Sequence, residues 1–265
     1  MLAVALTIAG SDPGGGAGIQ ADLKTFHQFG VYGTSAITLV TVQNTLRVSR
    51  VQTLDPDLVV EQIRAVLEDL PPQAAKTGAL GDTRIIEAVA SIDFGCPLVV
   101  DPVMISKHGA PLMPAEAKVT LRQLLLPRTA LITPNAEEAA DLAGIEVFDL
   151  PSMREAARRI AGLGARAVLV KGGHVSGDAT DILFDGSDFL EFEAPRIETR
   201  HTHGTGCSYS AAITAGLARG HDLAASVRRA KRWIADAIAT NPGLGGGHGP
   251  LNHWASPGAD SSNPL

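Results

Sequence analysis

The sequence is poor in cysteine: its 265 residues include only Cys96 and Cys207. The two form no C-x-x-C pair, so the pattern supports neither a zinc site nor a disulfide framework. The N-terminus also lacks a basic segment and a cleavage-like end, so its apolar stretch is interpreted as a first strand. Together these absences predict a protein of the reducing cytoplasm.

Long apolar runs and clustered basic residues are missing as well. No stretch of about 18 apolar residues occurs, so no membrane-spanning helix is expected. The net charge is -6 and lysine and arginine do not form runs, which argues against nucleic acid or an anionic membrane as the main partner. With 45% hydrophobic and 19% charged residues, the composition is typical of a soluble globular protein.

Two common nucleotide-binding signatures are absent. The stretch GSDPGGGAG (10–18) follows a strand but lacks the G-x-G-x-x-G spacing, and the strand at 34–43 ends in Gln43 and Asn44 without an acid for a ribose. No G-x-x-x-x-G-K-[ST] occurs either. The glycines at 10–18 indicate either close approach of the backbone to a ligand or a flexible turn.

Short β-rich runs alternate with helical patterns along some 200 residues, which predicts an α/β fold with a mostly parallel sheet and helices on both faces. Asp55 and Pro56 are typical of a helix start, Gly144 of a helix end, and Asp185-Gly186 of a hairpin turn. We expect one domain over residues 1–250 and a loose tail over 251–265. The stretch at 243–250 fits either a flap or part of that tail.

Polar side chains follow several predicted strands, where ligands bind in such sheets. Asp101 ends a buried strand and needs a partner or a function, either capping the next turn or contacting a metal ion through water. Asn135 and Glu138 share one helix face, either as an N-terminal cap or as ligands. Lys171, in VKGGH, is either a solvated charge or a functional group.

The strongest local signal is HTHGTGCSYSAA (201–212). Gly204 and Gly206 precede small residues that open a helix, and a helix N-terminus with close backbone approach binds anions. Cys207 then stands at the start of that helix, where it is either a packing residue or a reactive thiol. His203 and His174 are either ligands or catalysts or, as we expect for each alone, ordinary polar residues near a site.

Six motifs in order give the chain a family resemblance: LTIAGSDPGGGAGIQADLKTF, YGTSAITLVTVQNT, VVDPVM, LITPNAEEAADLAG, VKGGH and THGTGCSYSAAI. From about residue 3 to 250 the chain resembles the hydroxymethylpyrimidine/phosphomethylpyrimidine kinases of the ribokinase-like superfamily. The resemblance implies a three-layer α/β/α sandwich and two successive ATP-dependent phosphorylations of an aminopyrimidine in thiamine biosynthesis. It also implies Mg²⁺ as cofactor and a homodimer.

The resemblance also assigns site residues. The aminopyrimidine would contact Gly10, Asp22, Gln43 and Val103. The nucleotide would contact Asn135, Lys171 and Thr202. Magnesium would lie near Asp101 and Glu138. The catalytic anion hole would be formed by Gly204, Thr205, Gly206 and Cys207. Carboxylate and amide groups suit an aminopyrimidine, because they pair with its exocyclic amine and ring nitrogen.

The chain departs from the family pattern at Gly14, where serine is usual, at Ala79, where a methionine often touches the pyrimidine, and at His108, where a small residue is usual. The second change could enlarge the pocket. Cys207 itself replaces the aspartate of many superfamily relatives, and a thiol at a helix N-terminus is expected to have a depressed pKa. A cysteine that is neutral when an anionic monophosphate arrives would serve both steps.

Three other functions stay open at this point. Pyridoxal also carries a hydroxymethyl group on a nitrogen heterocycle, so a pyridoxal kinase is the main alternative. A cysteine hydrolase would use Cys207 with a histidine. A non-catalytic pyrimidine sensor would not need to keep Lys171 and Glu138, which speaks against that alternative.

Overall fold

The computed structural model describes residues 2–106, 109, 111–173 and 178–258, which include a nine-stranded sheet in the order β3-β2-β1-β4-β5-β6-β7-β8-β9. The strands are β1 (Val4–Ser11), β2 (Tyr32–Gln43), β3 (Val48–Thr53), β4 (Ala74–Thr77), β5 (Leu98–Val100), β6 (Leu131–Ile132), β7 (Val168–Val170), β8 (Asp181–Phe184) and β9 (Phe189–Phe192). The α-helices are α1 (Gly18–Gln28), α2 (Pro56–Asp69), α3 (Thr83–Ala90), α4 (Ala115–Thr120), α5 (Ala136–Ala143), α6 (Leu150–Gly162), α7 (Thr205–Ala218) and α8 (Leu223–Ala239).

Most of the sheet is parallel. Strands β2, β1, β4, β5, β6 and β7 run in one direction, whereas β3 is antiparallel to them at one edge. At the other edge β8 is antiparallel to β7, and β9 is antiparallel to β8. The mostly parallel α/β fold is therefore confirmed, as is the β8–β9 hairpin around Asp185-Gly186. Strand β3 and helix α4 are elements that the sequence pattern did not predict.

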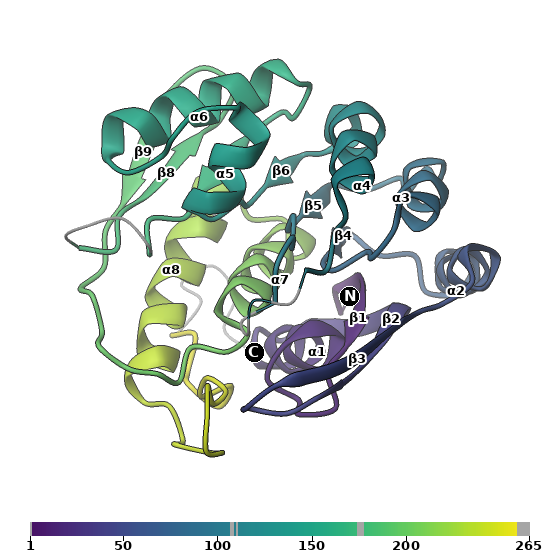
Figure 1. The fold of residues 1–265 in the computed structure, drawn as a ribbon, viewed down its shortest axis with the longest axis horizontal. Coiled ribbons are helices and arrows are strands. Elements are labelled where there is room, and N and C mark those ends of the chain that lie inside the picture. The colour runs from purple at the N-terminus through teal and green to yellow at the C-terminus, as the bar shows by residue number, and fades with distance from the viewer. Residues whose placement is uncertain (1, 107–108, 110, 174–177, 259–265) are drawn as a thin grey trace.

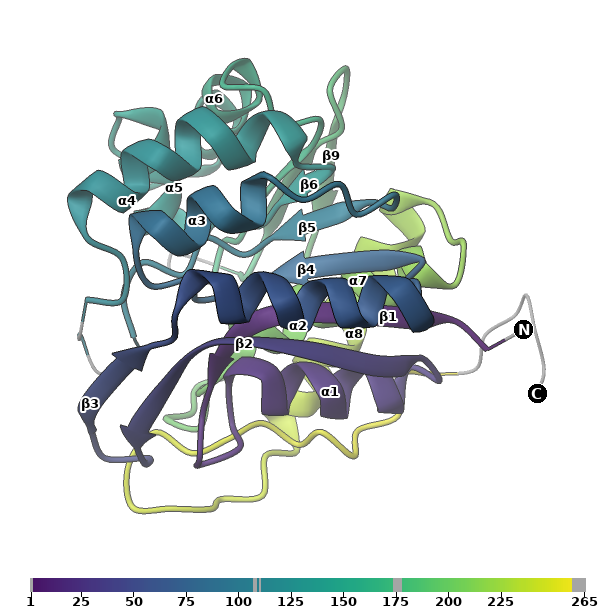
Figure 2. The same cartoon turned by 90° about the vertical axis from the view of Figure 1, so that its right-hand side faces the viewer.

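The helices form a layer on each face of the sheet. Helices α2 to α6 cover one face, and α1, α7 and α8 cover the other (Figures 1 and 2). Successive strand residues alternate between the two layers: Leu6 and Val100 pack with the first set of helices, and Ala5 and Val99 with the second. Because both faces of each central strand are covered, these strands are mostly apolar, and the three-layer sandwich is confirmed.

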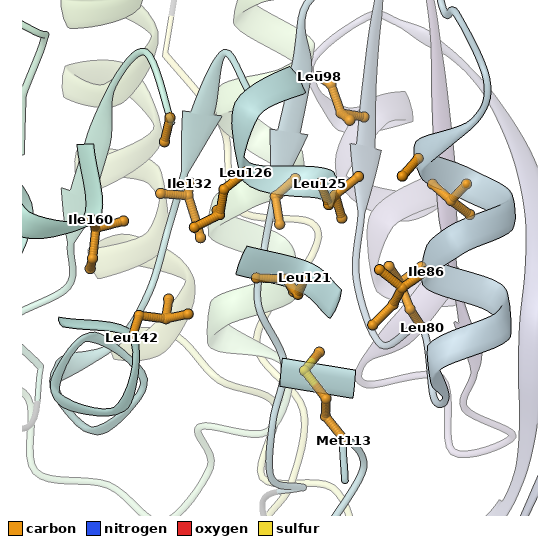
Figure 3. Close-up of a cluster of buried hydrophobic side chains, with 14 of the residues drawn as sticks. Leu80, Ile86, Leu98, Met113, Leu121, Leu125, Leu126, Ile132, Leu142 and Ile160 are labelled. Carbon is orange, nitrogen blue, oxygen red and sulfur yellow. The ribbon is translucent and has the colours of Figure 1, made fainter. Parts of the chain in front are cut away.

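Each layer has its own hydrophobic core. Figure 3 shows the first, where Ile86 of α3, Leu121 and Leu125 of the π-helical turn Leu121–Leu125, and Ile132 of β6 lie together under the helices. In the second core, Trp233 of α8 stands edge-on to Phe29, with ring centroids 5.2 Å apart, and α7 is buried along most of its length. The small residues of α7 let it lie close to the sheet.

Residues 251–255 pack against the second layer. Leu251, His253 and Ala255 are buried, and the indole nitrogen of Trp233 donates a hydrogen bond of 2.8 Å to the Ala255 carbonyl oxygen. The prediction of a loose tail is wrong for residues 251–255, because this segment buries apolar groups and satisfies a buried indole N–H. Among the described residues, no helix is long and apolar enough to cross a membrane.

Candidate active site

The carboxyl ends of the parallel strands meet at one edge of the sheet. Strand β1 lies between β2 and β4, and the chain reverses its strand order there, so this edge contains the switch point at which α/β sheets bind ligands. A cavity of about 400 Å³ opens at this edge. Its walls come from the carboxyl-terminal parts of β1 and β2, from the segments that follow β1, β4, β5, β6 and β7, and from the start of α7.

The predicted site residues line this one cavity, with a single exception. The lining residues among them are Gly10, Gln43, Asp101, Val103, Asn135, Glu138, Lys171, Thr202, Gly204, Thr205, Gly206 and Cys207. The exception is Asp22. The structure thus brings together groups that lie almost two hundred positions apart in the chain.

The start of α7 forms what we call the anion turn, residues 204–207. Gly204 is the N-terminal cap with φ of 80°, and a Cβ there would lie 1.8 Å from the carbonyl oxygen of Gly16, so only glycine fits. No side chain caps the helix, and residues 204–207 line the cavity, although the Thr205 amide donates to the Thr202 carbonyl oxygen at 3.3 Å. Uncapped amides and the helix dipole attract anions, so this turn can receive a phosphate group.

Lys171 and Asp101 lie beside the anion turn. The Nζ of Lys171 is 2.9 Å from Oδ1 of Asp101, and a Cβ on Gly206 would be 3.2 Å from the same Nζ. Burial opposes the charged form of Lys171, but the carboxylates of Asp101 and Glu138 outweigh it and raise its pKa. Lys171 is therefore a cation aimed at the place where the amides would hold an anion.

Asn135 and Glu138 form a capping box at the start of α5. The Glu138 amide donates to Oδ1 of Asn135, and the Asn135 amide donates to Oε2 of Glu138, both at 2.8 Å. The structural explanation of this pair is therefore confirmed, and both residues also line the cavity. Burial raises the pKa of Glu138 to about 7; Lys171 offsets this effect in part, while Asp101 adds repulsion.

Two carboxylates, Asp101 and Glu138, are thus held near each other in a buried place. Over the residues that the structure describes, no group of three or more His, Cys, Asp and Glu side chains has the arrangement of a metal site. Magnesium is usually bound by one or two carboxylates together with water and substrate phosphates. The donor set fits a magnesium ion that arrives with a nucleotide, and it does not resemble a site built from protein ligands alone.

Cys207 lines the cavity and is partly exposed. Burial and the nearby carboxylates of Asp22 and Asp101 raise its pKa to about 12 and so favour the neutral thiol, although the Lys76 ammonium and the Gly18 amide favour the thiolate. The expectation of a depressed pKa was wrong because burial outweighs the helix N-terminus. The other half of the prediction, a cysteine that is uncharged when an anionic acceptor arrives, agrees with this environment.

Asp22 lies behind the cavity wall. Its Oδ2 accepts hydrogen bonds from the Thr7 hydroxyl at 2.6 Å and from the Lys76 ammonium at 2.9 Å, and the side chain has no exposed surface. It does not line the cavity, so the geometry gives it a supporting place and not the direct contact with substrate that the resemblance implied.

Several cavity residues were not predicted. Asp12, the acid in the glycine stretch at 10–18, lines the cavity, and its position among glycines was a usable signal. Lys118 of α4 and Asp141 of α5 also line it and form an ion pair at 2.5 Å, but charges on helices give no such signal. His203 lines the cavity too. His108 and His174 lie outside the described residues.

Comparison with known proteins gives a consistent picture. A family model described as phosphomethylpyrimidine kinase matches residues 12–252. The chain is 49% identical over 256 residues to the hydroxymethylpyrimidine/phosphomethylpyrimidine kinase of Bacillus subtilis, which covers 95% of this chain and 94% of that protein.

Solved structures of two kinds are similar. A phosphomethylpyrimidine kinase from Clostridium difficile has a TM-score of 0.80 and 42% identity, covering 89% of this chain and 99% of that chain. An ADP complex of Bacillus subtilis pyridoxal kinase has a TM-score of 0.90 and 38% identity, covering 96% and 98%. The backbone is thus close to both kinases, so the choice of acceptor depends on side chains.

Proposed function

The chain belongs to the phosphomethylpyrimidine kinase family, and on that premise we propose that it phosphorylates 4-amino-5-hydroxymethyl-2-methylpyrimidine in two ATP-dependent steps. The first step gives the monophosphate and the second the diphosphate, as thiamine biosynthesis requires. One observation carries the proposal: the uncapped anion turn and the Lys171 ammonium face the same cavity as Gln43 and Gly10. A phosphoryl group held at the turn and an acceptor held beside Gln43 would share one chamber.

Phosphoryl transfer suits this chamber because its transition state is loose and needs mainly positioning and charge stabilisation. The first-turn amides of α7 and the Lys171 ammonium would stabilise negative charge on the transferred group. Thr202 and Asn135 would contact the nucleotide. Because the cavity is partly enclosed by protein, these charges act more strongly than they would in water.

The acceptor would be held by the carboxyl-terminal ends of β1 and β2 and by the segment that follows β5. The Gln43 amide offers both a donor and an acceptor, which matches a ring nitrogen beside an exocyclic amine. Val103 would supply an apolar wall, and Gly10 allows the ring to approach the backbone. Asp22 would support this wall from behind through its bonds to Thr7 and Lys76.

Cys207 would lie next to the attacking oxygen. As a neutral thiol it does not repel the anionic monophosphate of the second step. For the alcohol of the first step, a role for Cys207 as base would need its thiolate, which burial disfavours and which the Lys76 ammonium and the Gly18 amide favour only in part. Base strength matters less than position when the transition state is loose.

Asp101 and Glu138 would hold Mg²⁺ together with phosphate oxygens and water. When bound, the ion neutralises charge on the nucleotide phosphates. The Lys171–Asp101 pair would keep one carboxylate oriented toward that place.

We also propose that the protein is cytoplasmic and forms a homodimer. The homodimer is supported by the exposed apolar side chains of Val40, Val42 and Val51 on β2 and β3, and light scattering of the purified chain tests it.

A pyridoxal kinase is the second candidate. Ala79 gives the cavity a small side chain where family members often have methionine, and the fold is close to that of a pyridoxal kinase. A coupled assay of ADP release, run with magnesium and ATP on hydroxymethylpyrimidine, pyridoxal or no acceptor, separates the two. We expect the larger kcat/KM for hydroxymethylpyrimidine. A larger value for pyridoxal would move the assignment to B6 salvage.

A further inference from the structure

Asp12 organises the loop between β1 and α1, residues 12–17, which we call the glycine loop. Its Oδ1 accepts a hydrogen bond from the Gly14 amide at 2.8 Å, and its Oδ2 accepts from the amides of Gly16 at 3.1 Å and Ala17 at 2.9 Å. Only 2% of the residue is exposed. One carboxylate therefore fixes most of this loop, whose two ends, Asp12 and Ala17, line the cavity.

The same carboxylate reaches the anion turn. Oδ2 of Asp12 lies 2.9 Å from Nε2 of His203, the residue just before the cap of α7. His203 is 8% exposed, and its backbone amide donates to the carbonyl oxygen of Gly249 at 3.1 Å. The pair thus joins the glycine loop, the anion turn and the segment at 249–250.

The glycine loop and the anion turn are closely packed against each other. A Cβ on Gly204 would be 1.8 Å from the Gly16 carbonyl oxygen, and a Cβ on Gly16 would be 2.7 Å from Cδ2 of His203. A displacement of one loop must therefore displace the other, because closely packed groups cannot absorb it.

Asp12 also lies on the acceptor side of the cavity. It lines the cavity together with Gly10 and Gln43, and it directly follows β1, the strand that contains Gly10. The carboxylate that fixes the glycine loop therefore also borders the place where the acceptor would be held.

We propose that Asp12 and His203 are a positioning pair, which fixes the acceptor side of the cavity relative to the anion turn. This inference rests on the proposed kinase function. Neither residue is placed on the reacting atoms; they act through the glycine loop and through the cap of α7. Their loss should therefore lower kcat and relax the choice of acceptor, while the KM for ATP changes little.

The test measures kcat, both KM values and the hydroxymethylpyrimidine/pyridoxal preference for wild type and variants. Asp12→Asn keeps the shape but presents an amide, and His203→Leu removes the hydrogen bond. Each should lower kcat/KM for hydroxymethylpyrimidine about tenfold or more, with the KM for ATP within about twofold. The double variant should lose no more than the worse single variant, because both changes break one unit. His203→Gln retains an N–H donor and should recover most of the loss.

The chain offers a matched control, a second buried histidine that makes a hydrogen bond. Nε2 of His253 lies 2.9 Å from Oγ of Ser208, but neither residue lines the cavity. His253→Gln should leave kcat and acceptor preference unchanged. If the variants unfold at a lower temperature than this control, the kinetics of His203→Gln and His203→Leu are compared at a temperature where both variants are fully folded. This comparison decides whether the hydrogen bond itself matters.

The outcomes separate two failures. A wild-type chain without turnover on hydroxymethylpyrimidine overturns the proposed function. Active wild type with unaltered kcat and preference in Asp12→Asn and His203→Leu overturns the positioning pair alone. Additive losses in the double variant, or equal losses in His203→Gln and His203→Leu, also contradict it.

Discussion

The Nζ of Lys76 lies 2.9 Å from Oδ2 of Asp22, and neither side chain has any exposed surface. Burial opposes the charge on Lys76, but the Asp22 carboxylate outweighs it and raises the lysine pKa. The pair ties α1 to β4 directly behind Cys207, whose thiolate form the Lys76 charge favours.

Breaking this pair should be costly. Lys76→Met leaves an unpaired buried carboxylate, which typically destabilises a protein by about 3–5 kcal/mol. The double variant Lys76→Met/Asp22→Asn removes both charges and should recover part of that loss. Denaturant unfolding measures both. A single variant within about 1 kcal/mol of wild type would show that water reaches the pair.

The two phosphorylation steps should respond differently to a negative charge at position 207. Cys207→Asp places a fixed anion beside the monophosphate, so the second phosphorylation should fall about tenfold further than the first. Cys207→Ser, which stays neutral, should lower both steps alike. Single-turnover measurement of each step checks this, and equal losses in the aspartate variant would contradict the explanation.

Ala79 should set the tolerance for pyridoxal. Ala79→Met fills cavity space near Thr38, whose hydroxyl donates to the Ala79 carbonyl oxygen at 2.6 Å. We expect kcat/KM for pyridoxal to fall about tenfold or more and that for hydroxymethylpyrimidine to be retained. Competition between the two acceptors in one tube gives the ratio directly. A ratio that stays constant would remove Ala79 from the account of specificity.

His253 should make stability depend on pH. Burial lowers its pKa from 6.5 to about 4, with a smaller effect from the Lys24 charge. The unfolded chain therefore binds the proton first. Stability from this residue is complete above pH 6.5, declines as the pH falls toward 4, and changes no further below that, a total of about 3 kcal/mol.

The check is urea unfolding of wild type and His253→Gln between pH 4 and 7.5. The difference in unfolding free energy between the two should shrink as the pH falls through this window. Groups common to both proteins, such as Glu138, cancel in that difference. A constant difference would show that the 251–255 segment does not hold His253 in an apolar place.

Residues at strand ends were predictable from the sequence because their position is a local property. Asp101, Asn135 and Lys171 each follow a short apolar run, and parallel strands bring such positions to one edge. The anion turn was predictable for the same reason, since two glycines before small residues encode it locally.

Other features depend on partners distant in sequence. The sequence around Lys76 does not indicate that its charge is buried, because its partner Asp22 lies on α1, far away in the sequence. Strand β3 is exposed along most of its length, so apolar and polar residues do not alternate clearly enough in its sequence to predict an edge strand. The glycine- and proline-rich composition after residue 241 favoured a tail, whereas the partner of Ala255 is an indole on α8. The thiol pKa was misjudged because burial cannot be read from a helix start.

The most direct test of the account is a phosphorus NMR time course of the purified chain with magnesium, ATP and hydroxymethylpyrimidine. The account predicts that a monophosphate signal rises first and is then replaced by a diphosphate as ADP accumulates. Monophosphate that never advances would contradict the two-step reaction and the explanation of Cys207, and no acceptor signal at all would contradict the kinase.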